Sequence, residues 1–130
     1  MKPIKFRVHG DPTSKGRPRF NRMTGRTYTP QKTAEAERDF KVQALQYAPE
    51  KPFKGPIRLT VEIYKKRPKS RKGQKYCVTR PDLDNYAKLA GDALNNIFWE
   101  DDSQVVEIIA SKYYDDVPYT IVEVEEIEEK

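Results

Sequence analysis

A short run of residues alternates strictly between apolar and polar side chains. The run is Ile57, Arg58, Leu59, Thr60, Val61, Glu62 and Ile63. Successive side chains of a strand point to opposite faces of its sheet, so this pattern predicts a strand with one buried face. Such a strand must lie in a sheet whose apolar face is covered by another layer of structure.

Three further strands and two helices are predicted in the same way. Alternating or apolar runs predict strands at 4–8, 105–110 and 120–125, and apolar residues at helical spacing predict helices at about 30–47 and 82–97. The order of these elements predicts a mixed α/β (α+β) fold, in which two main helices pack on a mixed sheet of about four strands. With 130 residues, the whole chain is expected to be a single domain.

Charge divides the chain into two unequal halves. Residues 1–80 contain 22 Lys and Arg against 6 Asp and Glu, whereas residues 81–130 contain 3 against 14. The basic residues gather at about 11–29, a long loop or a poorly formed hairpin, and in a loop at about 65–80, and an acidic tail is expected at about 123–130. Basic surfaces indicate a nucleic-acid partner, because Lys and Arg neutralise phosphates and release counterions. The acidic half either balances the basic half across the fold or holds metal ions inside a basic groove.

Several other classes of protein are disfavoured by what the sequence lacks. Cys77 is the only cysteine, which excludes an intramolecular disulfide or a cysteine-based zinc cluster, and it is expected to be a small buried side chain. The start has no signal-peptide core, and no apolar run approaches the ~20 residues that span a bilayer. We therefore expect a soluble cytoplasmic protein with no membrane partner and no small-molecule cofactor. His9, the only histidine, falls on the first strand and is expected to be exposed.

The second predicted helix has acidic residues at both ends. Asp82 and Asp84 stand at its start, Lys88 follows one turn later, and Asp101-Asp102 lie beyond its end. Taken singly, Asp82 would cap the helix, Asp84 would complement its dipole, and Lys88 would pair with Asp84. Taken together, clustered carboxylates would repel one another unless a hard cation such as Mg²⁺ bound them. If the next strand runs back past the helix start, both acidic groups form a magnesium-dependent phosphoryl-transfer site, with Lys88 at the scissile phosphate.

The spacing of these residues resembles the signature of the RusA family of Holliday-junction resolvases. The matching segments are Arg80-Pro81-Asp82-Leu83-Asp84-Asn85-x-x-Lys88, Asp92-Ala93-Leu94 and Trp99-x-Asp101-Asp102-x-Gln104-Val105, preceded by the basic segment Pro12-x-Ser14-Lys15-x-Arg17-Pro18-Arg19. The resemblance covers roughly residues 6–110. It implies a small homodimeric endonuclease that uses Mg²⁺, or Mn²⁺ in its place, to nick two opposing strands of a four-way DNA junction during recombination and repair.

The resemblance also implies roles for individual residues. It assigns catalysis and metal binding to Asp82, Asp84 and Asp102, and catalysis to Lys88, while Asp101 remains a possible ligand beside Asp102. The metal would lower the pKa of an attacking water, and Lys88 would neutralise developing charge. From its spacing, Asp92 is expected to pair with Lys88 and hold that side chain in place. No residue suggests a covalent nucleophile.

The basic segments supply the residues expected to grip DNA phosphates. The candidates are Lys15, Arg17, Arg19, Arg22 and Arg26 in the first segment, and Lys65, Lys66, Arg67, Lys69, Arg71, Lys72, Lys75 and Arg80 in the second. Tyr28 and Tyr76 are expected to stack on unpaired bases. Two alternatives stay open: a nuclease that acts on flaps, forks or other branched DNA, and a non-catalytic DNA-binding module. An Asp82→Asn variant that binds DNA without cutting it would distinguish the enzyme from the module.

Overall fold

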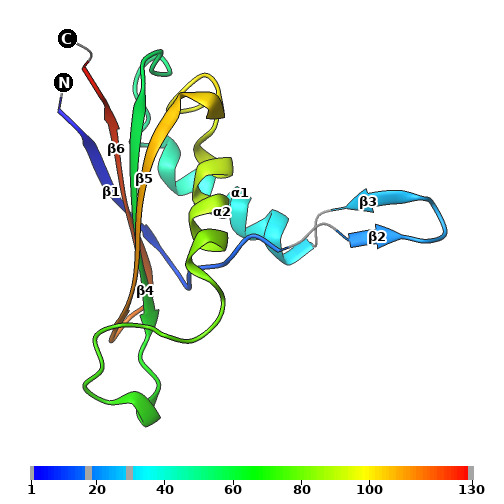
Figure 1. Ribbon diagram of the computed structural model, residues 1–130, viewed down its shortest axis with the longest axis vertical. Coiled ribbons are helices and arrows are strands. Elements are labelled where there is room, and N and C mark those ends of the chain that lie inside the picture. The colour runs from blue at the N-terminus through cyan, green and yellow to red at the C-terminus, as the bar shows by residue number, and fades with distance from the viewer. Residues whose placement is uncertain (1, 17–18, 29–30, 129–130) are drawn as a thin grey trace.

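The computed structural model describes residues 2–16, 19–28 and 31–128, and its main element is a four-stranded sheet. The strands are β1 (Ile4–His9), β4 (Ile57–Lys66), β5 (Val105–Asp115) and β6 (Tyr119–Glu126). They lie in the order β1-β6-β4-β5, with β4 and β5 parallel and the other neighbours antiparallel (Figure 1). The mixed sheet predicted from periodicity is confirmed.

Two helices, α1 (Gln31–Leu45) and α2 (Leu83–Leu94), pack on one face of this sheet (Figure 1). Leu59, Val61 and Val122 on that face are at most 1% exposed. Removing each such side chain from water stabilises the fold by about 1.5–3 kcal/mol. The alternation that predicted a half-buried strand therefore marks the face that the helices cover.

The chain reverses direction between α2 and β5 around two buried aromatic side chains. Phe98 and Trp99 are both 0% exposed. The helix ends at Leu94, earlier than predicted, because Asn95 already has extended backbone and Asn96 has a positive φ of 69°. Asn tolerates this left-handed conformation better than most residues with a side chain.

After the reversal, β5 runs back along α2 in the opposite direction. Near the end of β5, the Lys112 ammonium donates to the carbonyls of Thr79 and Pro81, just before α2 begins, at 2.7 and 3.0 Å. Asp102, just before β5 begins, lies beside the C-terminal half of α2. The sequence pattern had allowed a position near the start of this helix. Ten helical residues span about 15 Å, so Asp82 and Asp102 stand at opposite ends of this helix–strand pair.

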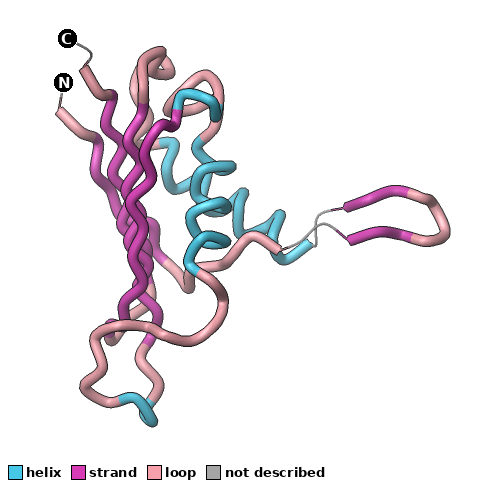
Figure 2. The backbone as a smooth tube through the Cα atoms, viewed as in Figure 1, coloured by secondary structure: helices cyan, strands magenta, loops and turns pink. Residues whose placement is uncertain are grey.

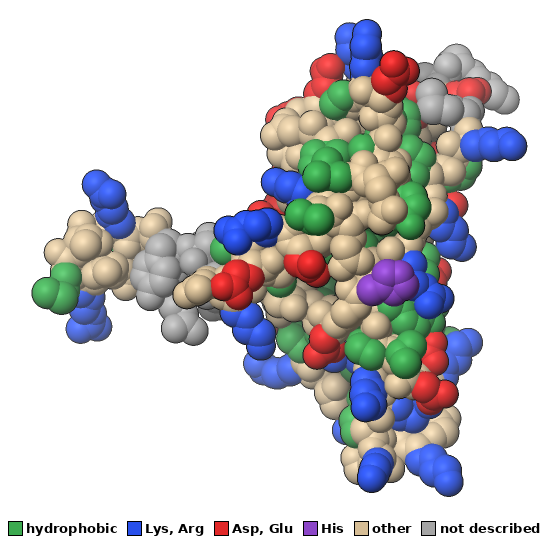
Figure 3. Space-filling model, turned by 180° about the vertical axis from the view of Figure 1, so that it is seen from behind, with side chains coloured by type: hydrophobic (Ala, Val, Ile, Leu, Met, Phe, Trp, Pro, Cys, Tyr) green, Lys and Arg blue, Asp and Glu red, His purple; other side chains and the backbone are tan. Residues whose placement is uncertain are grey.

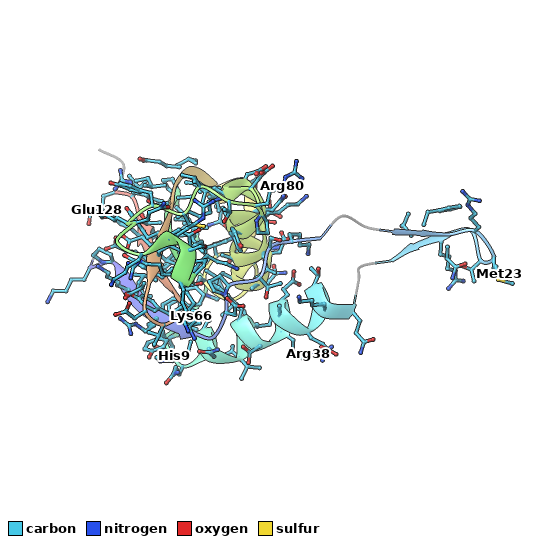
Figure 4. The ribbon with its side chains drawn as sticks, turned by 90° about the horizontal axis from the view of Figure 1, so that it is seen from below. His9, Met23, Arg38, Lys66, Arg80 and Glu128 are labelled. Carbon is cyan, nitrogen blue, oxygen red and sulfur yellow. The ribbon has the colours of Figure 1, made fainter. Side chains whose placement is uncertain are left out.

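The first basic segment contains a short hairpin. β2 (Arg19–Asn21) pairs with β3 (Arg26–Tyr28), and Figures 1 and 4 show the pair projecting from the helix side of the molecule. We call residues 19–28 the arm. The long loop or poorly formed hairpin predicted for this segment is therefore a formed hairpin over these residues.

The second basic segment is joined to the sheet. Lys65 and Lys66 extend β4. The following residues, 67–81, form a loop with a short 3-10 helix at Lys69–Arg71, and we call it the basic loop (Figure 2). Tyr76 in this loop bridges to Tyr113 of β5, with backbone hydrogen bonds on either side. The loop predicted at about 65–80 is thus partly paired with an edge strand.

The acidic end of the chain also belongs to the sheet. Glu125 in β6 and Glu107 in β5 both pair with Arg58 of β4, the latter at 2.9 Å. The Glu126 carboxylate accepts a hydrogen bond from the backbone N–H of Gly55 at 2.9 Å. Residues 123–126 of the predicted acidic tail therefore belong to β6, in agreement with the strand predicted at 120–125. Glu125 and Glu126 there balance basic and backbone groups of neighbouring segments.

Three expectations about single features can be compared with the structure. Cys77 is buried, at 5% exposure, and His9 is exposed, as predicted for both. Over residues 2–16, 19–28 and 31–128, no helix combines the length and apolar character needed to cross a membrane.

Candidate functional site

Two adjoining hollows form a groove between α2 and β5. One has a volume of about 630 Å³ and the other about 200 Å³, and both contain Ala87, Lys88 and Ile108 in their walls. We call them together the α2–β5 groove. The larger hollow is also lined by Leu83, Asp84 and Ala110, and the smaller by Leu59, Gly91, Asp92, Trp99, Asp102 and Val105. The groove brings Asp84, Lys88 and Asp102, all predicted site residues, to one surface.

Asp84 and Lys88 reach the groove because they lie one turn apart on α2. Both side chains are exposed. Among the residues that the structure describes, no ion pair joins Asp84 and Lys88. The i,i+4 ion pair that would give both residues a purely structural role is therefore not formed. An exposed carboxylate and a neighbouring ammonium are therefore available to a substrate that carries phosphate.

The orientation of Asp102 is set by the buried core. Its Oδ1 accepts a hydrogen bond of 3.1 Å from the indole Nε1 of Trp99, whose side chain is 0% exposed. A buried indole N–H needs such an acceptor, and its ring cannot rotate within a packed core. The carboxylate of Asp102 is thus held at the groove wall by the same residue that turns the chain toward β5.

Asp101 has a different, local role. Its carboxylate accepts hydrogen bonds from the backbone N–H of Ser103, at 3.0 Å, and from the Ser103 hydroxyl. Asp101 thereby caps a short 3-10 helix at Asp102–Gln104. The hydroxyl bond is the main reason that the pKa of Asp101 lies below its ordinary value, with the backbone bond second. The sequence left Asp101 and Asp102 as alternatives, and the structure places Asp102 in the groove wall.

Gln104 is a supporting residue that belongs to the quoted family signature but was given no role from the sequence. Its Oε1 accepts from the backbone N–H groups of Glu100 and Asp101, both at 2.8 Å. Its Nε2 donates to the carbonyls of Phe53 and Gly55, at 2.8 and 3.0 Å. One side chain thus ties the loop that carries Asp102 to the segment before β4. The Asp-x-x-Gln spacing from Asp101 to Gln104 matches a capping box and could have signalled this role.

Asp82 stands at the N-cap of α2 and is exposed, but its side chain makes no capping hydrogen bond. Among the described residues, no three Asp, Glu, His or Cys side chains are placed to hold one metal ion. The set of Asp82, Asp84 and Asp102 is therefore not assembled around one point within a single chain. The oxygen donors of the groove nevertheless fit Mg²⁺, which binds proteins through one or two carboxylates and completes its shell with water and substrate phosphate.

Lys15, predicted to contact DNA, is paired inside the protein. Its ammonium lies 2.7 Å from Glu37 of α1 and 3.0 Å from Asp92 of α2, and its side chain is 19% exposed. The backbone N–H of Lys15 also donates to the Asn85 carbonyl at 2.9 Å. The pair expected between Asp92 and Lys88 is not among the ion pairs of the described chain. Lys15 therefore fastens the segment before the arm to both helices.

Removing this ammonium should destabilise the protein in a pH-dependent way. Burial alone would lower the pKa of Lys15, but its hydrogen bonds to Glu37 and Asp92 raise it, and the net shift is upward. We expect Lys15→Met to lower the free energy of unfolding by about 1–3 kcal/mol at pH 7. A group whose pKa is raised on folding stabilises below its unfolded pKa and loses that contribution as pH rises through the folded pKa.

The deficit of Lys15→Met should therefore shrink above about pH 10.5, the ordinary range of a lysine. Urea unfolding of both proteins at pH 7 and at high pH measures this. Lys54→Met, which removes an exposed lysine, serves as the control and should change stability little at either pH. An equal deficit for Lys15→Met at both pH values would show that lost packing, not charge, explains the effect.

The other predicted DNA contacts lie mostly on the basic loop. Lys69, Lys72 and Arg80 are exposed, and Arg71 is half-buried. Figure 3 shows Lys and Arg side chains gathered at the end of the molecule formed by this loop, and Figure 4 places Arg80 on the helix side, near α2. Arg17 and the side chain of Arg19 lie outside the residues that the structure describes.

A row of contacting tyrosine rings packs the basic loop against the sheet. Tyr76 contacts Tyr113, Tyr113 contacts Tyr64, and Tyr64 contacts Tyr119, with ring centroids 5.5, 5.2 and 4.4 Å apart. Burial and a hydrogen bond to a neighbouring carboxylate raise the pKa of Tyr64 to about 12, so its hydroxyl stays neutral. Tyr76 ends the row and is 59% exposed, which leaves part of its ring open to a base. The side chain of Tyr28 lies outside the described residues.

Together, the fold and the groove define a small mixed α/β protein that presents exposed carboxylates and a lysine beside basic segments suited to a polyanion. A family model described as endodeoxyribonuclease RusA matches residues 9–125, so the chain belongs to the RusA family of endodeoxyribonucleases. The chain is also 36% identical, over 140 residues, to the uncharacterized protein YqaN of Bacillus subtilis (strain 168). That match covers 98% of this chain and 99% of YqaN. The family confirms the resemblance read from the aspartate and tryptophan spacing.

Proposed function

We propose that this protein is a metal-dependent endonuclease that resolves four-way DNA junctions by paired, symmetric nicks during recombination and repair. The observation that carries the proposal is the α2–β5 groove of a RusA-family chain, whose walls contain Asp84, Lys88 and Asp102. Phosphodiester hydrolysis needs groups that bind and polarise a phosphate and stabilise the charge that develops on it. These three side chains have that chemistry.

The groove residues would have different roles in hydrolysis. Asp82 and Asp84 at the helix start, and Asp102 farther along the groove, would bind Mg²⁺ or Mn²⁺ through one or two carboxylates per ion. The bound metal would supply Lewis-acid polarisation of the phosphodiester and a more acidic water. Lys88 contributes a positive charge at the scissile phosphate. Trp99 keeps the Asp102 carboxylate turned toward the groove through its indole N–H. Water is the proposed nucleophile, because Cys77 is buried away from the groove walls.

The proposed DNA-binding residues belong to the two basic segments of the chain. Lys69, Arg71, Lys72 and Arg80 on the basic loop would neutralise phosphates of the junction arms, together with Arg17 and Arg19 of the first basic segment. Lys15 belongs to the same proposal, but its ammonium is already paired with two carboxylates in the free protein. Its main role in the free protein is therefore to fix the segment before the arm to the two helices.

Paired nicks require two sites, so the proposal includes a homodimer. β5 is an edge strand, and apart from the bridge at Tyr76, none of the described residues pairs with its outer edge. Val106, Ile108 and Ile109 are 63%, 55% and 45% exposed along this strand. A free apolar edge is suited to association with another chain. Ile108 also lines the groove, so a second chain on this edge would border Lys88.

Cleavage of defined DNA substrates tests the proposal against its two alternatives. The purified protein should cut a four-way junction in Mg²⁺ at symmetric positions, faster than a fork, a flap or a linear duplex, and light scattering should give the mass of two chains. Faster cutting of forks or flaps would favour the broader branched-DNA nuclease. Binding to junctions without cutting in Mg²⁺ or Mn²⁺ would favour the non-catalytic module.

A further inference from the structure

The tip of the arm has a defined conformation and displays an apolar side chain. Asn21 Oδ1 accepts hydrogen bonds from the backbone N–H groups of Met23, at 2.9 Å, and Thr24, at 3.3 Å. The N–H of Gly25 donates to the Asn21 carbonyl at 2.8 Å, and Gly25 has a φ of 70°, which glycine adopts at little cost. This turn holds Met23 at the end of the arm with 96% of its surface exposed (Figure 4).

The surroundings of Met23 are suited to an anionic partner. Arg22 and Arg26 flank the tip and are exposed, and the sequence has no acidic residue between Asp11 and Glu35. Figure 3 shows Lys or Arg side chains on both edges of the arm and a hydrophobic side chain at its end. Exposing an apolar side chain at the end of a cationic projection has no benefit for folding, because no core lies there to cover it.

The segment that precedes the arm is bonded to α2, one of the two elements that form the α2–β5 groove. The arm projects from the helix side of the sheet (Figures 1 and 4). Just before the arm, Lys15 bonds to α2 through its backbone N–H and its ammonium. The same helix carries Asp84 and Lys88. The arm therefore extends from the side of the sheet on which α2, and with it one wall of the groove, lies.

We propose that Met23 is a wedge that enters the branch point of the DNA and unstacks bases there, while Arg22 and Arg26 hold the adjacent phosphates. This inference rests on the proposed function, since it names how the junction is engaged. DNA-binding proteins commonly insert Met, Leu or Phe between base steps, and two-stranded ribbons fit DNA grooves. Insertion costs least where stacking is already interrupted, which is the branch point of a junction.

The test uses the full chain and a four-way junction carrying 2-aminopurine at the branch point, in EDTA so that the DNA stays uncut. Binding should raise the fluorescence of this base as it unstacks. Met23→Ala should lose most of that rise even at protein concentrations that saturate the junction, so that weaker binding does not account for the loss. Met23→Leu, which keeps an apolar wedge, should retain the rise. Val42→Ala, which trims a 61% exposed side chain on α1, should behave like the natural protein.

The outcomes separate the wedge from the proposed function. A full fluorescence rise with Met23→Ala, in a protein that still binds and cuts junctions in Mg²⁺, would overturn the wedge alone. Failure of the natural protein to bind or cut any branched DNA would overturn the proposed function and the wedge together. If Met23→Ala instead changes the mass measured by light scattering, the tip contacts a second chain, and the wedge is also overturned.

Discussion

Asp84→Asn should slow Mg²⁺-dependent cleavage of a four-way junction by at least about two orders of magnitude, the usual cost of removing a group that stabilises transition-state charge. Asn keeps the shape of the side chain but loses the charge that a hard cation requires. Binding to the junction in EDTA should persist or strengthen slightly, because a negative charge beside the phosphates is removed. Single-turnover cleavage and a parallel binding titration measure the two effects separately.

Asp39→Asn is the matched control, because its side chain is exposed on α1 and is not among those that line the α2–β5 groove. It should cleave like the natural protein. The charge of Asp84 also complements the N-terminal dipole of α2, so Asp84→Asn should lose about 0.3–1 kcal/mol of stability. Assays must therefore run well below the unfolding temperature. Cleavage by Asp84→Asn at the rate of Asp39→Asn would remove Asp84 from the proposed site.

Gln104→Leu should be among the most destabilising single changes at a partly exposed position. It removes four hydrogen bonds, two accepted by Oε1 and two donated by Nε2. At a net ~1 kcal/mol for each bond, with some replacement by water, the free energy of unfolding should fall by about 2–4 kcal/mol. Cleavage at a temperature where the variant stays folded should also fall by about 10-fold or more, because Asp102 lies in the loop that Gln104 holds.

Gln46→Leu provides the comparison, since Gln46 is exposed after α1 and makes one hydrogen bond, to the Gln43 carbonyl. It should change stability by no more than about 0.5 kcal/mol. Urea unfolding of the two variants measures the difference. If Gln104→Leu and Gln46→Leu are equally stable, the bonds to Phe53 and Gly55 contribute nothing to the fold, and Gln104 has no positioning role.

The elements of this fold were accessible from local patterns. Alternation at Ile57–Ile63 and helical spacing after Asp82 predicted a strand and a helix that the structure contains, because periodicity records which face of an element is buried. The predicted end of the second helix was less accurate, because the positive φ of one residue, Asn96, lies just beyond the observed end of α2. The arm was ambiguous because its strands are three residues long and too short for alternation to identify.

Part of the candidate site could also be predicted from local spacing, and part could not. Asp84 and Lys88 share a groove because they lie four positions apart on one helix. This spacing can be read from the sequence. The choice of Asp102 over Asp101 depended on hydrogen bonds to Trp99 and Ser103. Adjacent aspartates look alike in a sequence, so only the packing of the turn could separate their roles.

The sequence by itself determined the mixed α/β fold, the basic character of two segments, and the carboxylate and lysine pattern of the RusA family. These depend on side-chain type and spacing along the chain. Only the tertiary structure decided that β5 returns along α2 from its C-terminal end, that Asp82 stands apart from Asp102, and that Lys15 is paired with Glu37 and Asp92. Those relations join residues far apart in the chain, and they are set by how the helices and strands pack their buried faces, which no local spacing records.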